Sequence, residues 1–206
     1  MRKITFWLAL GVLSLGAATA QAMMVQSELG YSITLPAGWV VLEKKTVKET
    51  PEIVDAAMNA AGQTQGINAI PEKVMAAVKD LIGQGKIDYY FSPDPGYNLS
   101  AYETVGSLTQ AEKDTVDICA SLREEMKKET EGQSTVYDCQ VKRLGMRDGL
   151  FLAAEDYRMG QKYVQQMVQK DPEHILIFTV SASAKQKDVD SMKKDMMAIM
   201  QTVKVN

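Results

Sequence analysis

Short segments of alternating apolar and polar residues run through most of the chain. Residues 29–42 contain this alternation at Tyr31, Ile33 and Leu35, then a Pro-Ala-Gly break, then a second apolar stretch from Trp39. A period of two is typical of a strand with one buried face, and proline with glycine marks a turn. Segments rich in tyrosine and valine on both sides of a loop of turn residues predict a hairpin at residues 87–91 and 99–105. Four further strands are expected at about 134–144, 149–158, 162–170 and 174–183, and their connections are short enough for neighbours to pair antiparallel.

Two other segments carry apolar residues at helical spacing. One helix is expected over residues 109–131, and a methionine-rich helix is expected over about 188–201. Their apolar stripes are Ala111, Thr115, Ile118, Leu122 and Met126, and Val189, Met192, Met196, Ile199 and Val203. Methionine at this spacing is typical of core packing rather than of a soft-metal site.

Residues 50–85 predict two shorter helices joined by a polar linker. Thr50-Pro51 is a typical helix start, and Gly62 stands where that helix would end. Pro71 begins the second helix, which ends near Gly83.

The elements follow one another as a strand pair, two helices, a hairpin, a helix, four strands and a last helix. This order predicts an α+β fold in which helices pack on a central antiparallel sheet. The two longer helices could share one face of the sheet or cover one face each, and the pattern leaves both arrangements open.

The first 22 residues predict a cleaved signal peptide. Arg2 and Lys3 precede an apolar run over residues 4–17, and Ala20-Gln21-Ala22 offers a small-x-small cleavage site. The apolar run is short for a membrane span, so no transmembrane segment is expected after cleavage. Residues 23–206 are then expected to form one domain, with a helical insertion at about 50–85. The predicted location is the periplasm, with release into the medium as the alternative.

The charge balance bears on the kind of partner. The net charge is −3, and it becomes −5 once Arg2 and Lys3 leave with the signal peptide. Nucleic acids and anionic lipid surfaces require clustered lysine and arginine, so we do not expect either as the main partner.

The chain contains two cysteines, Cys119 and Cys139. Cys119 shares the expected helical stripe with Leu122, and Cys139 shares a strand face with Tyr137 and Val141. Both therefore point toward the core from consecutive elements, and an even pair in an oxidising compartment predicts a disulfide. Two buried free thiols are the alternative.

Reactive groups do not converge in the sequence. His174 is the single histidine, it lies in an expected turn, and no carboxylate stands at ligand spacing from it. Nucleophile-elbow, zinc-protease, Cys-x-x-Cys and phosphate-loop motifs are absent from the sequence. The acid pairs Glu124-Glu125 and Glu155-Asp156 diverge, because adjacent residues leave a helix or a strand in different directions. No catalytic, cofactor or metal site is therefore predicted, and we expect the chain not to be an enzyme.

Several short motifs resemble the PsbP/DcrB-like proteins. The opening YSITLPAGW, the Asn98-Leu99-Ser100-Ala101 strand ahead of the long helix, residues 149–170 and ILIFTVSAS at 175–183 follow the order of that family over about residues 29–205. The resemblance implies an α/β/α sandwich and a binding or scaffold role without a shared active site. Residues 50–85 depart from the family pattern.

These observations favour an exported, non-enzymatic binding or scaffold protein of the bacterial envelope. Its partner would be an unidentified protein or envelope component, bound through residues 50–85. One alternative is a carrier of a small hydrophobic ligand, suggested by 13 methionines and 8 tyrosines that can line adaptable cavities. Another is a hydrolase that uses sequence-distant carboxylates. A concave apolar pocket would favour the carrier, and a flat polar surface would favour a protein partner.

Overall fold

The structure, a computed structural model, describes residues 22–52, 54–57, 72–94, 97–108, 115–185 and 187–206. Most of the expected signal peptide, the linker within residues 50–85 and the first turns of the helix expected over 109–131 lie outside these residues. No helix in the described ranges is long and apolar enough to cross a membrane.

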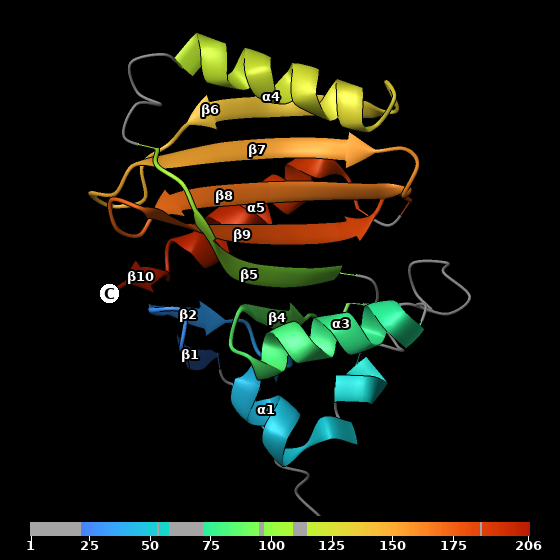
Figure 1. Cartoon of the computed structure of the whole chain (residues 1–206), viewed down its shortest axis with the longest axis vertical. Helices are drawn as coiled ribbons and strands as arrows, with labels where there is room; N and C mark the ends of the chain where they lie inside the picture. The colour runs from blue at the N-terminus through green and yellow to red at the C-terminus, as the bar shows by residue number, and fades with distance from the viewer. Residues whose placement is uncertain (1–21, 53, 58–71, 95–96, 109–114, 186) are drawn as a thin grey trace, which may run out of the picture.

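A seven-stranded antiparallel sheet forms the centre of the fold (Figure 1). Short turns join its last four strands, so neighbours in sequence pair in space, and the two strands of the expected hairpin also pair antiparallel. The strand order is β3-β4-β5-β9-β8-β7-β6, with β3 (Val40–Leu42), β4 (Ile87–Phe91), β5 (Tyr97–Val105), β6 (Ser134–Val141), β7 (Gly149–Asp156), β8 (Gln161–Gln169) and β9 (His174–Ser183).

A second, three-stranded sheet brings the two ends of the described chain together. β2 (Tyr31–Leu35) lies between β1 (Met23–Ser27) and β10 (Lys204–Val205) and pairs antiparallel with both. The expected strand pair is therefore divided, because β2 joins this sheet whereas β3 joins the larger one. β1 and β10 were not predicted from the sequence.

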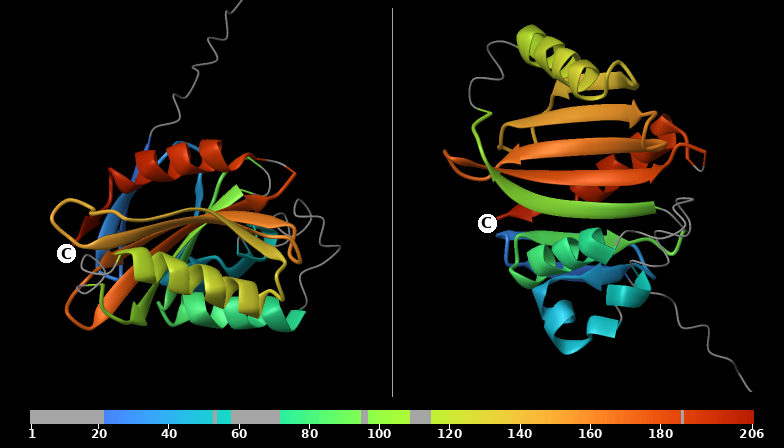
Figure 2. Two further views of the ribbon diagram at one scale, coloured as in Figure 1. Left: turned by 90° about the horizontal axis from the view of Figure 1, so that it is seen from above. Right: turned by 45° about the vertical axis from the view of Figure 1, so that its right-hand side comes forward.

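Helices cover both faces of the large sheet, which confirms the α+β prediction (Figure 2). α5 (Val189–Met200) and the small sheet pack on one face, and α3 (Glu72–Gly83) and α4 (Thr115–Glu129) pack on the other. The two longer helices thus take one face each. Asp188 caps the N-terminus of α5, its side chain accepting a hydrogen bond from the Ser191 amide. The helix buries Met192, Met196 and Ile199, as its stripe predicts.

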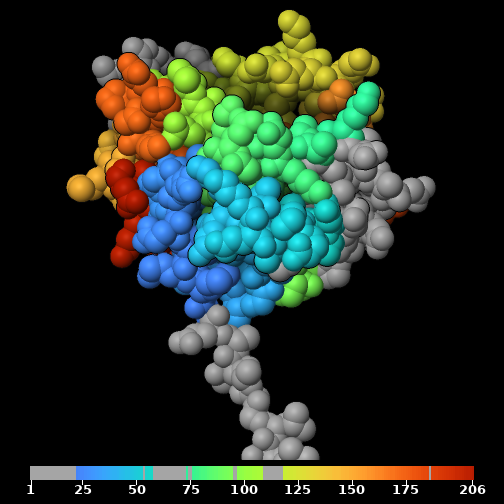
Figure 3. All heavy atoms as spheres, turned by 60° about the horizontal axis from the view of Figure 1, so that its bottom comes forward, coloured from blue at the N-terminus to red at the C-terminus, as the bar shows by residue number. Residues whose placement is uncertain are grey.

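The segment before α3 contains a helix that the apolar pattern missed. α1 (Lys44–Glu49) has the mainly polar sequence KKTVKE, which carries no apolar stripe. Residues 51–52 and 54–57 are also helical, and Val54 packs with Leu42 and Ile82 in a small core of their own. β1 and β2 (blue), α1 (cyan) and α3 (green) form one continuous surface beside the C-terminal residues (dark red, Figure 3).

Candidate functional site

A pocket of about 580 Å³ lies where three distant segments of the chain meet. They are the loop between β6 and β7, the C-terminal end of α5, and the residues around β10. Figure 1 places this loop, the β8–β9 turn and β10 at the same end of the large sheet. The volume is in the range of small-molecule sites.

Apolar side chains make up most of the lining of this pocket. Met196 and Met200 are buried where they meet it, whereas Met146 is 97 % exposed and Met197 is 42 % exposed at its margin. Methionine adapts its shape to a bound group more readily than branched side chains do. The apolar lining consists of Leu144, Met146, Phe151, Met196, Met197, Met200, Val203 and Val205.

Four basic residues also line this pocket, and among the described residues no acidic side chain does. Lys142 Nζ lies 5.2 Å from the centre of the Phe151 ring. Arg143 forms an ion pair with Asp148, at 3.2 Å between Nε and Oδ1. Arg147 and Lys204 complete the set. The pocket therefore joins an apolar wall to a positive rim.

The shape of the β6–β7 loop follows from two residues beside it. Gly149 has no room for a Cβ, which would lie against the Lys142 carbonyl oxygen and 2.9 Å from that of Met167. Gln166 is buried, and its Nε2 donates to the carbonyls of Lys142, Leu150 and Met167 at 3.3, 3.4 and 3.0 Å. These bonds hold the loop close to the sheet.

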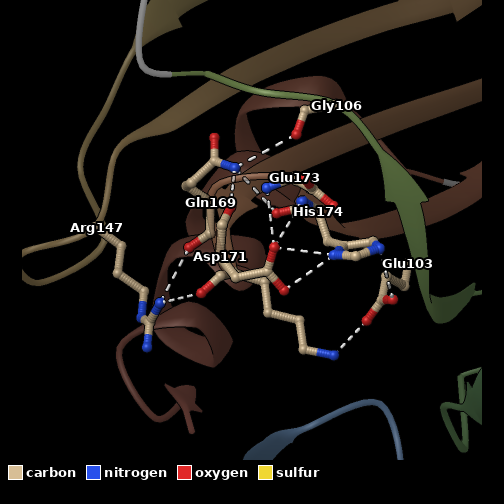
Figure 4. A network of polar contacts seen from close by, with 8 residues as sticks. Glu103, Gly106, Arg147, Gln169, Asp171, Glu173 and His174 are labelled. Atoms are coloured by element: carbon tan, nitrogen blue, oxygen red, sulfur yellow. Dashed lines mark hydrogen bonds and ion pairs between the residues drawn. The ribbon is translucent and has the colours of Figure 1, made fainter.

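Arg147 ties the same loop to the C-terminal strand. Its guanidinium donates to the carbonyl oxygens of Gln169 at the end of β8, of Lys170 in the β8–β9 turn and, at 3.1 Å, of Val205 in β10. Gln169 in turn accepts from the Leu108 amide and donates to the His174 carbonyl at 3.1 Å. Figure 4 shows the bonds of Arg147 to the β8–β9 region and those of Gln169, and through Arg147 this network holds part of the pocket lining in place.

His174 has the carboxylate neighbours that the sequence did not reveal. Its Nδ1 lies 2.9 Å from Asp171 Oδ1, and its Nε2 lies 3.9 Å from Glu103 Oε1 (Figure 4). Bonds from the Glu173 amide and the His174 ring hold the pKa of Asp171 below its usual value. Within the described ranges, no group of three or more His, Cys, Asp or Glu side chains is arranged to hold a metal ion. Both ring nitrogens of His174 therefore face carboxylates, and these contacts hold the β8–β9 turn beside β5.

A second, smaller pocket of about 200 Å³ brings together three sequence-distant acids, Glu28, Glu43 and Asp88. Asp88 is buried, and its Oδ2 accepts hydrogen bonds from the hydroxyls of Ser27 and, at 2.8 Å, Tyr31. Burial raises the pKa of Asp88 above its usual value, although these hydroxyl bonds oppose the shift. Burial and the nearby Asp88 likewise raise the pKa of Glu43. Because the hydroxyls already occupy Oδ2, the arrangement favours a structural role for Asp88.

The structure joins Cys119 and Cys139 in a disulfide between α4 and β6, with the two Cα atoms 5.7 Å apart. Cys139 faces the α4 side with Val141, as the strand pattern predicts. The expectation for Tyr137 was wrong. A β-bulge between Val136 and Asp138 displaces it, leaving it 48 % exposed with its hydroxyl on Glu155.

Sequence reasoning missed the residues of the larger pocket. The basic segment Lys142-Arg143-Leu144-Gly145-Met146-Arg147 was the available signal, since it puts three cations and an exposed methionine in one turn. The expected contact surface at residues 50–85 is described only in part, because residues 58–71 lie outside the described ranges.

Comparison with known proteins supports the fold. No family model matches the chain, and no curated protein matches it. The solution structure of cyanobacterial PsbP (CyanoP) from Synechocystis sp. PCC 6803 is similar over 93 % of this chain and 96 % of that one, at 11 % identity and a TM-score of 0.51. The chain thus has a PsbP-like fold, and at this identity the likeness shows the fold alone.

Two other solved structures are more distant. A Pseudomonas aeruginosa protein of unknown function, PA94, described as a putative regulator, is 16 % identical, with 56 % of this chain and 80 % of that one covered and a TM-score of 0.40. A structure from Bacteroides thetaiotaomicron VPI-5482 is 12 % identical, with 85 % of this chain and 45 % of that one covered and a TM-score of 0.35.

Proposed function

We propose that this chain is an exported, non-enzymatic binding protein of the bacterial envelope, and that the pocket between the β6–β7 loop and α5 holds a small, largely apolar ligand. Membership of the PsbP/DcrB-like group of envelope proteins is part of this proposal. The fold and the short motifs support it, and the Cys119–Cys139 disulfide fits an oxidising compartment such as the periplasm.

One observation carries the ligand assignment. The pocket is concave, about 580 Å³ in volume, and walled by methionines from α5 and the β6–β7 loop. Core packing alone would bury these side chains, yet Met146 and Met197 remain exposed at the margin. A ligand that covers them would remove apolar surface from water, at about 25 cal/mol per Å². This geometry favours a small-molecule carrier over a protein partner bound through residues 50–85.

The hydrolase alternative receives less support. Glu28, Glu43 and Asp88 meet at the smaller pocket, but Lys44 pairs with Glu28 at 2.6 Å and Ser27 and Tyr31 bind Asp88. A general acid and base would need free carboxylate oxygens on both sides of a substrate.

Titration with Nile red, a neutral apolar dye, tests the proposal. We expect saturable fluorescence enhancement with one dye per chain, and about tenfold weaker binding in Met197→Glu, because a carboxylate in the apolar wall must be desolvated. Met159→Glu is the matched control, since Met159 is exposed in the β7–β8 turn and does not line the pocket. Equal dye affinity in wild type and in a folded Met197→Glu variant would contradict the assignment.

A further inference from the structure

The basic rim of the pocket specifies the ligand further. We propose that the pocket binds a free, single-chain amphiphile with one carboxylate end, with the chain against the methionines and the carboxylate between Lys142 and Lys204. This inference rests on the proposed function and adds the chemical class of its ligand.

The first argument is charge complementarity. The whole chain is acidic, with 26 Asp and Glu against 23 Lys and Arg. Around this pocket the balance reverses, because four lining residues are basic and none of the described lining residues is acidic. The net charge disfavours a broad anionic surface as partner, but the local field favours one anionic group.

The second argument is that the rim cations are unequally engaged. Arg147 is held by three backbone carbonyls, and Arg143 is paired with Asp148. Lys142 rests near the Phe151 ring, and neither it nor Lys204 has an ion pair in the described part of the chain. An anionic group such as a carboxylate is what two such ammonium ions would bind.

The third argument separates a free amphiphile from a membrane surface. Leu144 and Val205 are half-buried in the lining of the pocket, so a narrow chain that enters the concavity can reach them, with the buried Met196 and Met200 packed behind. A bilayer surface would contact only the exposed Met146 and Met197. An acidic chain is also repelled by anionic lipid as a whole.

The two lysines could instead serve only the fold. Both lie near the C-terminal end of α5, whose carbonyl ends carry partial negative charge. That role predicts lower stability without them and no change in ligand affinity, which makes the two roles separable by experiment.

The test is displacement of Nile red by dodecanoate, dodecyltrimethylammonium and dodecanol, the two ions kept below their micelle concentrations and dodecanol below its solubility limit. We expect dodecanoate to displace the dye about tenfold more tightly than dodecanol, and the cation to be weakest. The preference for dodecanoate should shrink in high salt. It should vanish in Lys142→Gln/Lys204→Gln and persist in Lys127→Gln/Lys128→Gln, a control with the same charge change on the opposite face of the sheet.

The remaining outcomes overturn the inference in distinguishable ways. Equal displacement of the dye by dodecanoate and dodecanol would contradict recognition of a carboxylate, but it would not contradict an apolar ligand in the pocket. A Lys142→Gln/Lys204→Gln variant that melts earlier but keeps its dodecanoate preference would assign the lysines to the fold. Binding to phosphatidylglycerol vesicles that is lost in Lys142→Gln/Lys204→Gln, and that dodecanoate does not inhibit, would show that the two lysines bind a membrane surface instead. Failure of all three compounds, with dye binding insensitive to Met197→Glu, would overturn the proposed function as well.

Discussion

Asp88 links the two sheets, and its removal should be costly. It lies on β4 of the large sheet, is 3 % exposed, and accepts bonds from Ser27 and Tyr31 at the small sheet. Tyr31 also shares a 2.6 Å hydrogen bond with the hydroxyl of Tyr90. In Asp88→Ala the Tyr31–Tyr90 bond remains, but the Ser27 and Tyr31 hydroxyls lose their acceptor.

The expected loss follows from these contacts. Two hydroxyls left without this acceptor, the buried one of Tyr31 and the half-buried one of Ser27, at about 1–2 kcal/mol each, give a destabilisation of about 2–4 kcal/mol. For a chain of this length, that corresponds to a fall in melting temperature of roughly 5–15 °C. Urea unfolding followed by circular dichroism measures it. Asp88→Asn is the matched control, because the amide oxygen can still accept, and it should cost well under half as much.

The same pair of variants tests the ionisation of Asp88. Because burial raises the pKa of Asp88 in the folded chain, the native state binds its proton more tightly than the unfolded state does. The contribution of Asp88 protonation to the free energy of unfolding is therefore fully present below the pKa that Asp88 has in the unfolded chain. It is lost as pH rises through the higher pKa of Asp88 in the folded chain. Wild type should lose stability relative to Asp88→Asn as pH rises from acid toward neutral. A loss of less than about 1 kcal/mol in Asp88→Ala, or the opposite pH trend, would refute this account of the network.

Three further outcomes are expected. Cys119→Ser/Cys139→Ser should lower the unfolding free energy by about 3 kcal/mol, since the disulfide closes a 20-residue separation, and an unchanged melting temperature with reductant would contradict this. Gly149→Ala should lower the unfolding free energy by about 2 kcal/mol or more in urea because its Cβ would meet two carbonyl oxygens. Gly83→Ala, whose Cβ would make an ordinary contact with Val47 Cγ1 at 3.6 Å, should be neutral or stabilising. Arg147→Lys should lower the unfolding free energy by about 1 kcal/mol, because an ammonium cannot donate to three carbonyls in the geometry of the guanidinium. It should also speed amide hydrogen exchange in β10, and unchanged protection of β10 would contradict the proposed role of Arg147 in holding that strand.

The elements that were predictable from sequence are those whose signal is local. β4 and β8 alternate with a period of two, short turns separate the strands from β6 to β9, and α5 carries Met192, Met196 and Ile199 at helical spacing. The disulfide was also accessible, because Cys119 and Cys139 each shared a stripe with core residues.

The elements that were missed depend on contacts between distant segments. β10 has two residues and pairs with β2 at the other end of the described chain, so no local pattern marks it. The bulge at Tyr137 shifts the alternation of β6 by one residue, so Val136 rather than Tyr137 shares a face with Cys139 and Val141, and no local pattern marks this shift. The pocket combines Lys142, Met197 and Lys204, which are unrelated in sequence until the small sheet brings the C-terminus to the β6–β7 loop.

Methionine methyl groups give the most direct test of the binding site, because the pocket wall carries four of them. In a methyl-labelled sample titrated with dodecanoate, the resonances of Met146, Met196, Met197 and Met200 should shift together and saturate. Those of Met126 and Met159, which do not line the pocket, should stay in place. Shifts confined to Met126 or Met159, or no shift at any of the four pocket methionines, would contradict the account.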